Sequence, residues 1–159
     1  MLSYYQVSYY RGKMVVSVSP TGLGQACSSA IDLSTISSPY TGSTVSSTNF
    51  LTGTYSCAAH PAPDLVFTYF LPPGGTISLQ QTWNDYDSYH ELRYGESCPG
   101  SNVIQCIDDS DSTAVTWTNT ESTVQQIFYV QSGSSAGEGI FTLTWNVLGG
   151  KSVSWRVSM

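Results

Sequence analysis

The residues of this chain best suited to chemistry are acidic, and they occur in two short runs. Asn84-Asp85-Tyr86-Asp87 is one run and Asp108-Asp109-Ser110-Asp111 is the other. Calcium takes six to eight oxygen ligands, often from carboxylates and loop carbonyls at such short spacing. If a hairpin joins the strands between the runs, both reach the same end of a sheet, where unpaired carboxylates repel one another unless a cation intervenes. The candidate calcium ligands are Asp85, Asp87, Asp108 and Asp109; the alternative is that these residues only form turns.

Catalytic arrangements are hard to find in the sequence. A serine triad needs Ser, His and Asp within mutual reach, and the chain has no G-x-S-x-G motif. Both histidines have plainer explanations, because His60 precedes Pro61 in a loop and His90 lies in a strand. A glycosidase needs two carboxylates in one cleft. The glutamates are instead scattered over strand ends and loops: Glu91, Glu96, Glu121 and Glu138. We therefore expect no catalytic residues and no enzyme.

Four cysteines, Cys27, Cys57, Cys98 and Cys106, favour disulfides over a metal site. A zinc site would use C-x-x-C pairs or several histidines, and the chain has neither. Four cysteines allow three pairings, and their spacing does not choose among them. Disulfides imply an oxidising compartment. We expect an extracellular or cell-surface protein.

Composition and charge restrict the partners. Only 10% of the residues are charged, against about 25% in ordinary soluble domains. The net charge of −6 opposes binding to nucleic acid or to an anionic membrane surface. No apolar run approaches the roughly 20 residues that a spanning helix needs, so we expect no membrane insertion. Calcium as a cofactor, or a neutral polymer such as a polysaccharide as a partner, suits this balance better.

Alternation of apolar and polar residues dominates the chain and predicts β-strands. Strands are expected at residues 4–10 and 14–19 around a turn at 11–13, and at 141–147 and 152–158 around a turn at 148–151. Between them we expect strands at 65–71, 76–83, 89–94, 103–106, 114–118 and 124–131, with residues 34–54 as an irregular crossing or an edge strand. Short strands separated by Gly, Pro, Asn and Asp predict an all-β fold, an antiparallel β-sandwich.

An ordered set of motifs resembles the bacterial pre-peptidase C-terminal (PPC-like) domain family from Cys27 to about Trp145. Its members are Ala26-Cys27-Ser28-Ser29, Pro63-Asp64-Leu65-Val66-Phe67, Gly75-Thr76-Ile77-Ser78-Leu79, Tyr86-Asp87-Ser88, Gly95-Glu96-Ser97-Cys98 and Cys106-Ile107-Asp108-Asp109. His90 stands where this family has an aliphatic core residue. The resemblance implies a jelly-roll-like sandwich with two disulfides, Cys27–Cys57 and Cys98–Cys106. It also implies a non-enzymatic module of secreted hydrolases or of large surface proteins.

The organisation expected from these patterns has three parts. Residues 1–26 form an N-terminal β-hairpin extension, residues 27–147 form the PPC-like β-sandwich domain, and residues 148–159 add a C-terminal strand.

Tyrosines on both faces of the first strand suggest that this strand has a neighbour. The candidate assembly residues are Tyr4, Tyr5, Val7, Tyr9 and Tyr10. Uncharged edge strands invite strand addition, so self-association or pairing with neighbouring domains is expected. The sequence therefore favours a non-catalytic, adhesive or structural module of a surface or filament. The alternatives are a hairpin that completes the chain's own sandwich, and a module that targets a secreted hydrolase to polysaccharide or protein fibre.

Overall fold

A computed structural model describes residues 24, 27–51, 62–134 and 137–149, and the backbone of two further strands at 5–10 and 13–18. Almost all of the regular structure in this part is β, and no α-helix occurs among the described residues. Two short 3-10 turns, η1 (Cys27–Ser29) and η2 (Leu33–Thr35), precede the main strands. The strands are β1 (Tyr5–Tyr10), β2 (Lys13–Val18), β3 (Ile31–Asp32), β4 (Tyr40–Ser43), β5 (Leu65–Leu71), β6 (Gly75–Asn84), β7 (Ser88–Tyr94), β8 (Asn102–Ile107), β9 (Val115–Thr118), β10 (Gln125–Gly133) and β11 (Ile140–Gly149).

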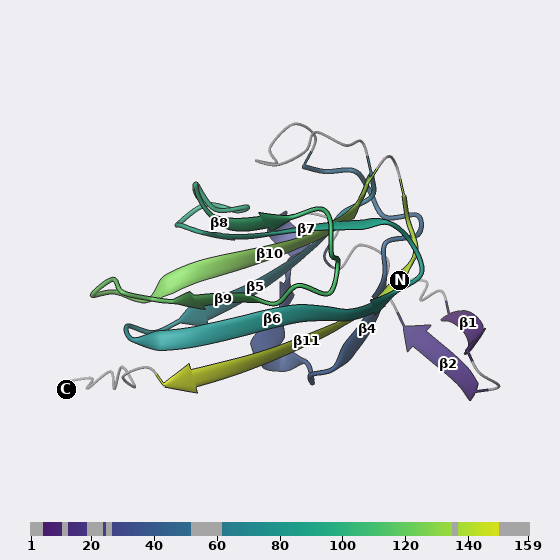
Figure 1. The fold of residues 1–159 in the computed structure, drawn as a ribbon, viewed down its shortest axis with the longest axis horizontal. Helices are drawn as coiled ribbons and strands as arrows, with labels where there is room; N and C mark the ends of the chain where they lie inside the picture. The colour runs from purple at the N-terminus through teal and green to yellow at the C-terminus, as the bar shows by residue number, and fades with distance from the viewer. Residues whose placement is uncertain are drawn as a thin grey trace.

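Two sheets face each other as the layers of a sandwich (Figure 1). One has five strands in the order β3-β5-β10-β7-β8, and the other has four in the order β4-β11-β6-β9. All pairs are antiparallel except β3 with β5. The all-β sandwich predicted from the sequence is therefore confirmed.

Most predicted strands agree with the structure to within two residues. The predicted turn at 148–151 is partly wrong, because Leu148 and Gly149 continue β11 and pair with Thr76 and Gly75 of β6. The region 34–54 contains β4, an edge strand of the four-stranded sheet. The strand predicted at 152–158 lies outside the described residues.

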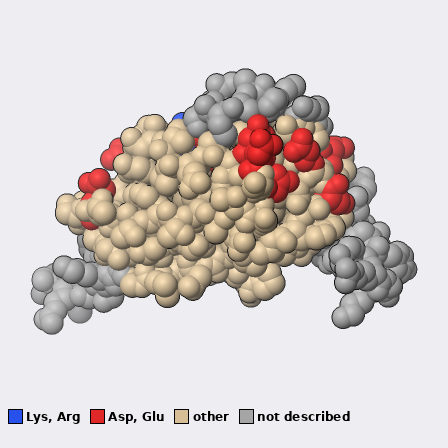
Figure 2. Space-filling model, viewed as in Figure 1, with Lys and Arg blue, Asp and Glu red and all other residues tan. Residues whose placement is uncertain are grey.

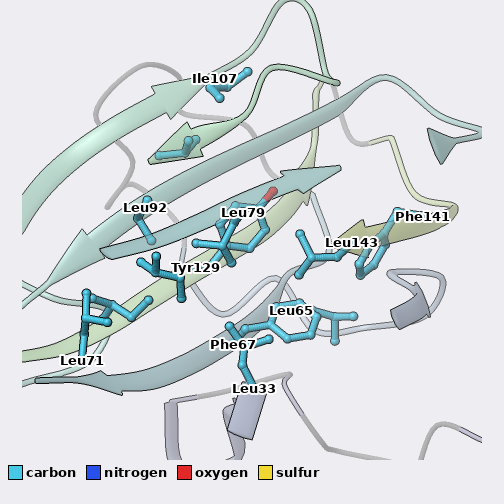
Figure 3. Close-up of a cluster of buried hydrophobic side chains, with 13 residues drawn as sticks. Leu33, Leu65, Phe67, Leu71, Leu79, Leu92, Ile107, Tyr129, Phe141 and Leu143 are labelled. Atoms are coloured by element: carbon cyan, nitrogen blue, oxygen red, sulfur yellow. The ribbon is translucent and has the colours of Figure 1, made fainter. Parts of the chain in front are cut away.

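The main core fills the space between the sheets (Figure 3). Phe67 of β5 lies at its centre, with its ring edge-on to Phe141 at 6.2 Å and to Tyr40 at 5.6 Å between centroids. Such edge-to-face pairs add to the free energy gained by burying the rings. Burial alternates along β6 from Gly75 to Thr82, with Ile77 and Leu79 fully buried, as period-two patterning predicts.

A second apolar cluster covers the outer face of the five-stranded sheet. Leu51, Val66, Phe128 and Val130 are buried there, packed against Cys27, Ala30 and Cys98. Because side chains alternate along a strand, the intervening residues Phe67 and Tyr129 point into the main core. Strand β10 is consequently buried on both faces from Ile127 to Gly133.

The expected disulfides are wrong. Cys27 is bonded to Cys98, with 5.5 Å between their Cα atoms, so neither Cys27–Cys57 nor Cys98–Cys106 can form. The hairpin of β7 and β8 does form, but its register places Cys106 opposite Glu91, four residues beyond Asn102. That offset is about 13 Å along the strand, too far for Cys106 to reach a cysteine in the hairpin loop. The bond instead ties η1 to that loop across the second cluster.

Of the remaining two cysteines, the structure describes only one. Cys106 is also disulfide-bonded. Cys57 lies outside the described residues. Disulfides point to a non-cytoplasmic environment.

The N-terminal hairpin has the strands predicted from the sequence. β1 and β2 pair over six residues, from Tyr5 with Val18 to Tyr10 with Lys13. They form a two-stranded sheet of their own that is not hydrogen-bonded to either layer of the sandwich (Figure 1).

Peptide mapping without reduction tests the cysteine connectivity. We expect one linked pair of peptides containing Cys27 and Cys98, and a second pair containing the remaining cysteines, Cys57 and Cys106. Reduction should lower the melting temperature clearly, since a native bridge usually contributes about 2–5 kcal/mol to the stability of such a domain. Recovery of a Cys98–Cys106 peptide would contradict the register of β7 and β8.

Candidate functional site

The two acidic runs meet at one end of the sandwich, as the sequence predicts. The carboxylate of Asp111, in the loop after β8, accepts a hydrogen bond from the side-chain amide of Asn84 and one from the backbone N–H of Ser88 at 3.3 Å. Both donors belong to the other run or to the strand that follows it. On the face shown in Figure 2 most acidic side chains lie at the upper right, with others at the left edge, and little Lys or Arg is visible.

The four predicted calcium ligands occupy different positions at this end. The Asp85 carboxylate accepts a hydrogen bond from the backbone N–H of Ile140 at 2.6 Å and so fixes the β6–β7 turn to the start of β11. Asp87 is exposed, and its backbone carbonyl accepts from Ser134 at 2.8 Å. Asp108 and Asp109 lie on the β8–β9 loop, the first half-buried and the second exposed.

The carboxylates of Asp85 and Asp111 thus accept hydrogen bonds from N–H groups of neighbouring loops. This is the role expected if the acidic residues only form turns. Asp111, absent from the predicted set, makes the link between the two runs. No group of three or more His, Cys, Asp or Glu residues that could hold a metal occurs within the described ranges. Calcium bound by Asp85, Asp87, Asp108 and Asp109 stays a prediction.

Beneath these loops, a polar network lies inside the core between the sheets. The buried amide of Gln131 donates to Gln81 at 2.6 Å and to the hydroxyl of Tyr86 at 2.9 Å. Gln81 in turn donates to the hydroxyl of Ser88 at 2.6 Å. Burial raises the pKa of Tyr86 to about 12, so its hydroxyl stays protonated. Because buried polar groups are costly when unpaired, this network links β6, β7 and β10 in one register.

His90 lies next to this network but takes no part in it. It is fully buried, and its ring stacks on Tyr129 with 5.6 Å between centroids. Neither ring nitrogen has a hydrogen-bond partner. Burial lowers the pKa of His90 to about 4, although the charge of Asp111 acts in the opposite direction. The imidazole is therefore neutral and enclosed.

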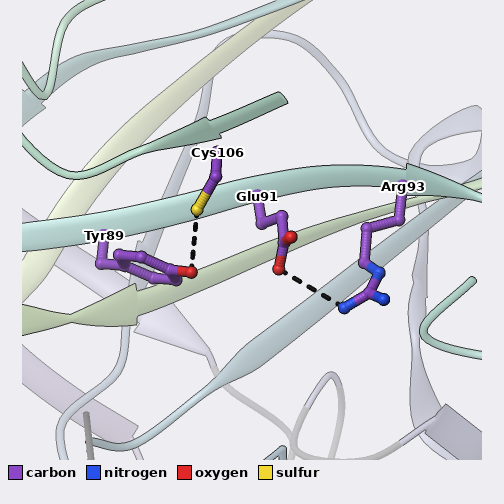
Figure 4. Close-up of polar contacts among 4 residues, drawn as sticks. All are labelled: Tyr89, Glu91, Arg93 and Cys106. Carbon is purple, nitrogen blue, oxygen red and sulfur yellow. Dashed lines mark hydrogen bonds and ion pairs between the residues drawn. The ribbon is translucent and has the colours of Figure 1, made fainter. Parts of the chain in front are cut away.

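A second polar group lies on the outer face of the five-stranded sheet (Figure 4). The carboxylate of Glu91, fully buried, pairs with the guanidinium of Arg93 at 3.5 Å. Nearby, the hydroxyl of Tyr89 and the sulfur of Cys106 are hydrogen-bonded at 2.8 Å. Since removing one member of a buried ion pair leaves a charge without compensation, Glu91 has a structural role here.

Open strand edges are the other candidate surface. Strand β8 is an edge of the five-stranded sheet, has half of its residues exposed, and contains no charged residue or proline. Strand β11 pairs with β4 only from Ile140 to Leu143, so among the described strands its last six residues have a neighbouring strand on one side only. On the other side the N–H of Trp145 is bonded to the hydroxyl of Ser38 at 3.0 Å, and the groups beyond it form the open part of the edge. Leu148, in that stretch, is 62% exposed. Unpaired N–H and C=O groups along such edges can accept another strand.

The predicted assembly residues are described only in part. Tyr5, Val7, Tyr9 and Tyr10 lie on β1, whose backbone pairing is known and whose side chains are not described. Tyr4 lies outside the described residues.

A scan of the sequence against models of known protein families gives no match, and a search of curated proteins gives none either. The PPC-like resemblance stays a prediction. No helix among the described residues is long and apolar enough to cross a membrane.

The buried histidine predicts a specific pH dependence of stability. The pKa of His90 is about 4 in the folded chain and about 6.5 when unfolded, so the unfolded state binds a proton first as pH falls. The contribution of His90 to the free energy of unfolding is therefore complete above about pH 6.5. It decreases as the pH falls from 6.5 to 4, by roughly 3 kcal/mol in total. In His90→Leu, this component should disappear. Urea unfolding of both proteins between pH 4 and 7 measures it, and parallel stability curves would contradict the assignment.

Proposed function

We propose that this chain is a non-catalytic, extracellular module with a structural or adhesive role, which associates with neighbouring copies or domains through strand edges. The observation that carries the proposal is the N-terminal hairpin. Among the described strands its two strands pair only with each other, and neither adds to a sheet of the sandwich.

An isolated two-stranded hairpin is only marginally stable in water. A third strand would pair its free backbone groups and cover one of its faces. The sequence of β1, Tyr5-Gln6-Val7-Ser8-Tyr9-Tyr10, has no charge to prevent this and carries aromatic residues on both faces. A free hairpin of this sequence would present an apolar patch of a kind that is uncommon on monomeric proteins. These properties favour a partner strand outside the hairpin over a free hairpin.

The sandwich offers edges that could accept the hairpin of another copy. Strands β8 and β11 combine open backbone groups with uncharged, β-branched or aromatic side chains. A bulge opposite Leu92 and Arg93 interrupts the pairing of β7 with β8. Bulges twist an edge and weaken its ability to pair. The regular edge at the end of β11 is accordingly the better acceptor.

An extracellular location is part of the same proposal. It is supported by the Cys27–Cys98 bond, by the low content of charged residues and by a surface rich in Ser and Thr. Such a module suits a surface layer or filament, where protein copies are concentrated and adhesion follows from repeated contacts.

Removal of the hairpin tests the proposal directly. We expect the full chain to associate at high concentration in sedimentation velocity, and a chain lacking residues 1–18 to be monomeric with the same circular dichroism and melting temperature. Val7→Pro should also prevent association, because proline in the middle of a strand removes a backbone donor. Ser3→Pro, before the strand, is the matched control and should associate normally.

Two results would contradict the proposal. A full chain that stays monomeric at millimolar concentration would show that the edges do not associate. Unfolding of the sandwich when residues 1–18 are removed would instead assign the hairpin to this chain's own core.

A further inference from the structure

A groove of about 480 Å³ opens on the outer face of the five-stranded sheet, at the end opposite the acidic loops. The end of β5, the β7–β8 loop and the β9–β10 connection form its walls, and it is lined by Phe70, Gly95, Glu96 and residues 123–126. This volume lies within the range of about 300–1,000 Å³ that is usual for small-molecule sites.

An exposed phenylalanine forms the apolar part of the groove. Phe70 lies on β5 directly opposite Gln126 of β10 and is 57% exposed, although Phe67 and Phe128 on the same two strands are buried. Val124, on the groove's other wall, is 41% exposed. Contiguous exposed apolar surface often marks a binding site, and a groove that contains two such side chains is a candidate for one. Single exposed apolar residues, by contrast, are ordinary.

The polar lining is held in place before any ligand arrives. The amide nitrogen of Gln126 donates to Thr68 at 3.1 Å, and Thr68 donates to the carbonyl of Ile127 at 2.9 Å. The Gln126 side chain is thus fixed with its carbonyl oxygen as the remaining acceptor. Gln125 donates to Thr123 at 3.0 Å, which orders the neighbouring side chain in the same way.

The loop wall is also fixed to the sheet. The backbone N–H of Gly95 donates to the carbonyl of Gln126 at 3.0 Å. Gly95 has φ +142°, and a Cβ at this position would come within 3.0 Å of Ser101 backbone. Only glycine fits without strain, so the position of Glu96 at the rim is set by the backbone.

The chemistry of this lining selects one class of ligand. It combines one aromatic face with amide, hydroxyl and carboxylate groups, and no Lys or Arg is among the lining residues. An anionic ligand would find no counter-charge, while a purely apolar ligand would leave the polar groups without partners. A neutral sugar ring has a C–H face that can pack on an aromatic ring and hydroxyls that can pair with amides and a carboxylate.

We propose that this groove binds a neutral saccharide chain, with one ring stacked on Phe70 and its hydroxyls hydrogen-bonded to Gln126 and Glu96. This binding is independent of the strand association proposed above, since the groove contains no part of the hairpin. It would give the module a substrate contact as well as a structural one.

Titration of the ¹⁵N-labelled full chain with defined oligosaccharides tests the site. The probes are hexaoses of β-1,4-linked glucose, β-1,4-linked xylose, β-1,4-linked N-acetylglucosamine and α-1,4-linked glucose. We expect at least one of them to shift the amide signals of Gly95, Glu96 and Gln126, with a dissociation constant of about 1 mM or below. No shift at these amides with any of the four would overturn the proposal.

Variants of Phe70 test whether saccharide binding depends on stacking against its ring or only on exposed aromatic surface in general. Phe70→Ala should weaken binding about tenfold or more, and Phe70→Tyr, which keeps the ring, should retain it. Phe50→Ala is the matched control, because Phe50 is 46% exposed but lies outside the groove. Equal losses in Phe70→Ala and Phe50→Ala would contradict the assignment. So would conversion of an associating full chain to monomers by Phe70→Ala, since the groove would then be an interface between copies.

Discussion

The structure depends on burial of the five-stranded sheet on both of its faces. In most two-layer sandwiches one face of each sheet meets water, and strands alternate between apolar and polar residues. Here the central strand β10 is buried on both sides from Ile127 to Gly133. The inner face meets the four-stranded sheet through Tyr129, and the outer face meets the second cluster through Phe128 and Val130. The disulfide and the groove both depend on what covers that outer face.

The Cys27–Cys98 bond matters because it fixes part of this cover. It joins the start of the domain to the β7–β8 loop over Phe128 and Val130. The same loop forms one wall of the groove at Phe70, where the cover ends and the sheet becomes exposed. The outer face is thus divided into a buried region that stabilises the fold and an open region that can bind. Edge strands, which lie at the sides of both layers, are left for association.

Strand positions could be predicted from the sequence because they depend on local patterning. The alternation of Ile77, Leu79 and Gln81 marks one inward face of β6, although a glutamine at an inward position gives no sign of its partner. Gln81 and Gln131 are fifty residues apart and meet only because β6 and β10 face each other across the core. The same limit explains the wrong disulfides. Cysteine pairing depends on how loops stack on a sheet, and the sequence near Cys98 suggested only a local hairpin.

For the loops that contain the two acidic runs, the sequence also predicts some contacts and not others. The sequence predicts that the two runs meet, since the β7–β8 hairpin brings its ends together, and the structure confirms it. Which carboxylate makes the contact depends on the loop path after Ile107, and that path places Asp111 against Asn84 and Ser88. Likewise, nothing in the local sequence distinguishes the exposed Phe70 from the buried Val66, which lies on the same outer face of β5. The difference arises because the cover of the outer face ends before Phe70.

Hydrogen–deuterium exchange, measured by mass spectrometry on the oxidised and the reduced protein, tests the two-sided burial most directly. We expect the amides of residues 127–131 to exchange more slowly than those of any other strand in the oxidised protein, because they open only with global unfolding. Reduction should speed exchange in η1, the β7–β8 loop and the outer-face residues of β5 and β10 first. If residues 127–131 instead exchange as fast as the edge strand β8, or if reduction leaves these segments unchanged, the central claim is contradicted.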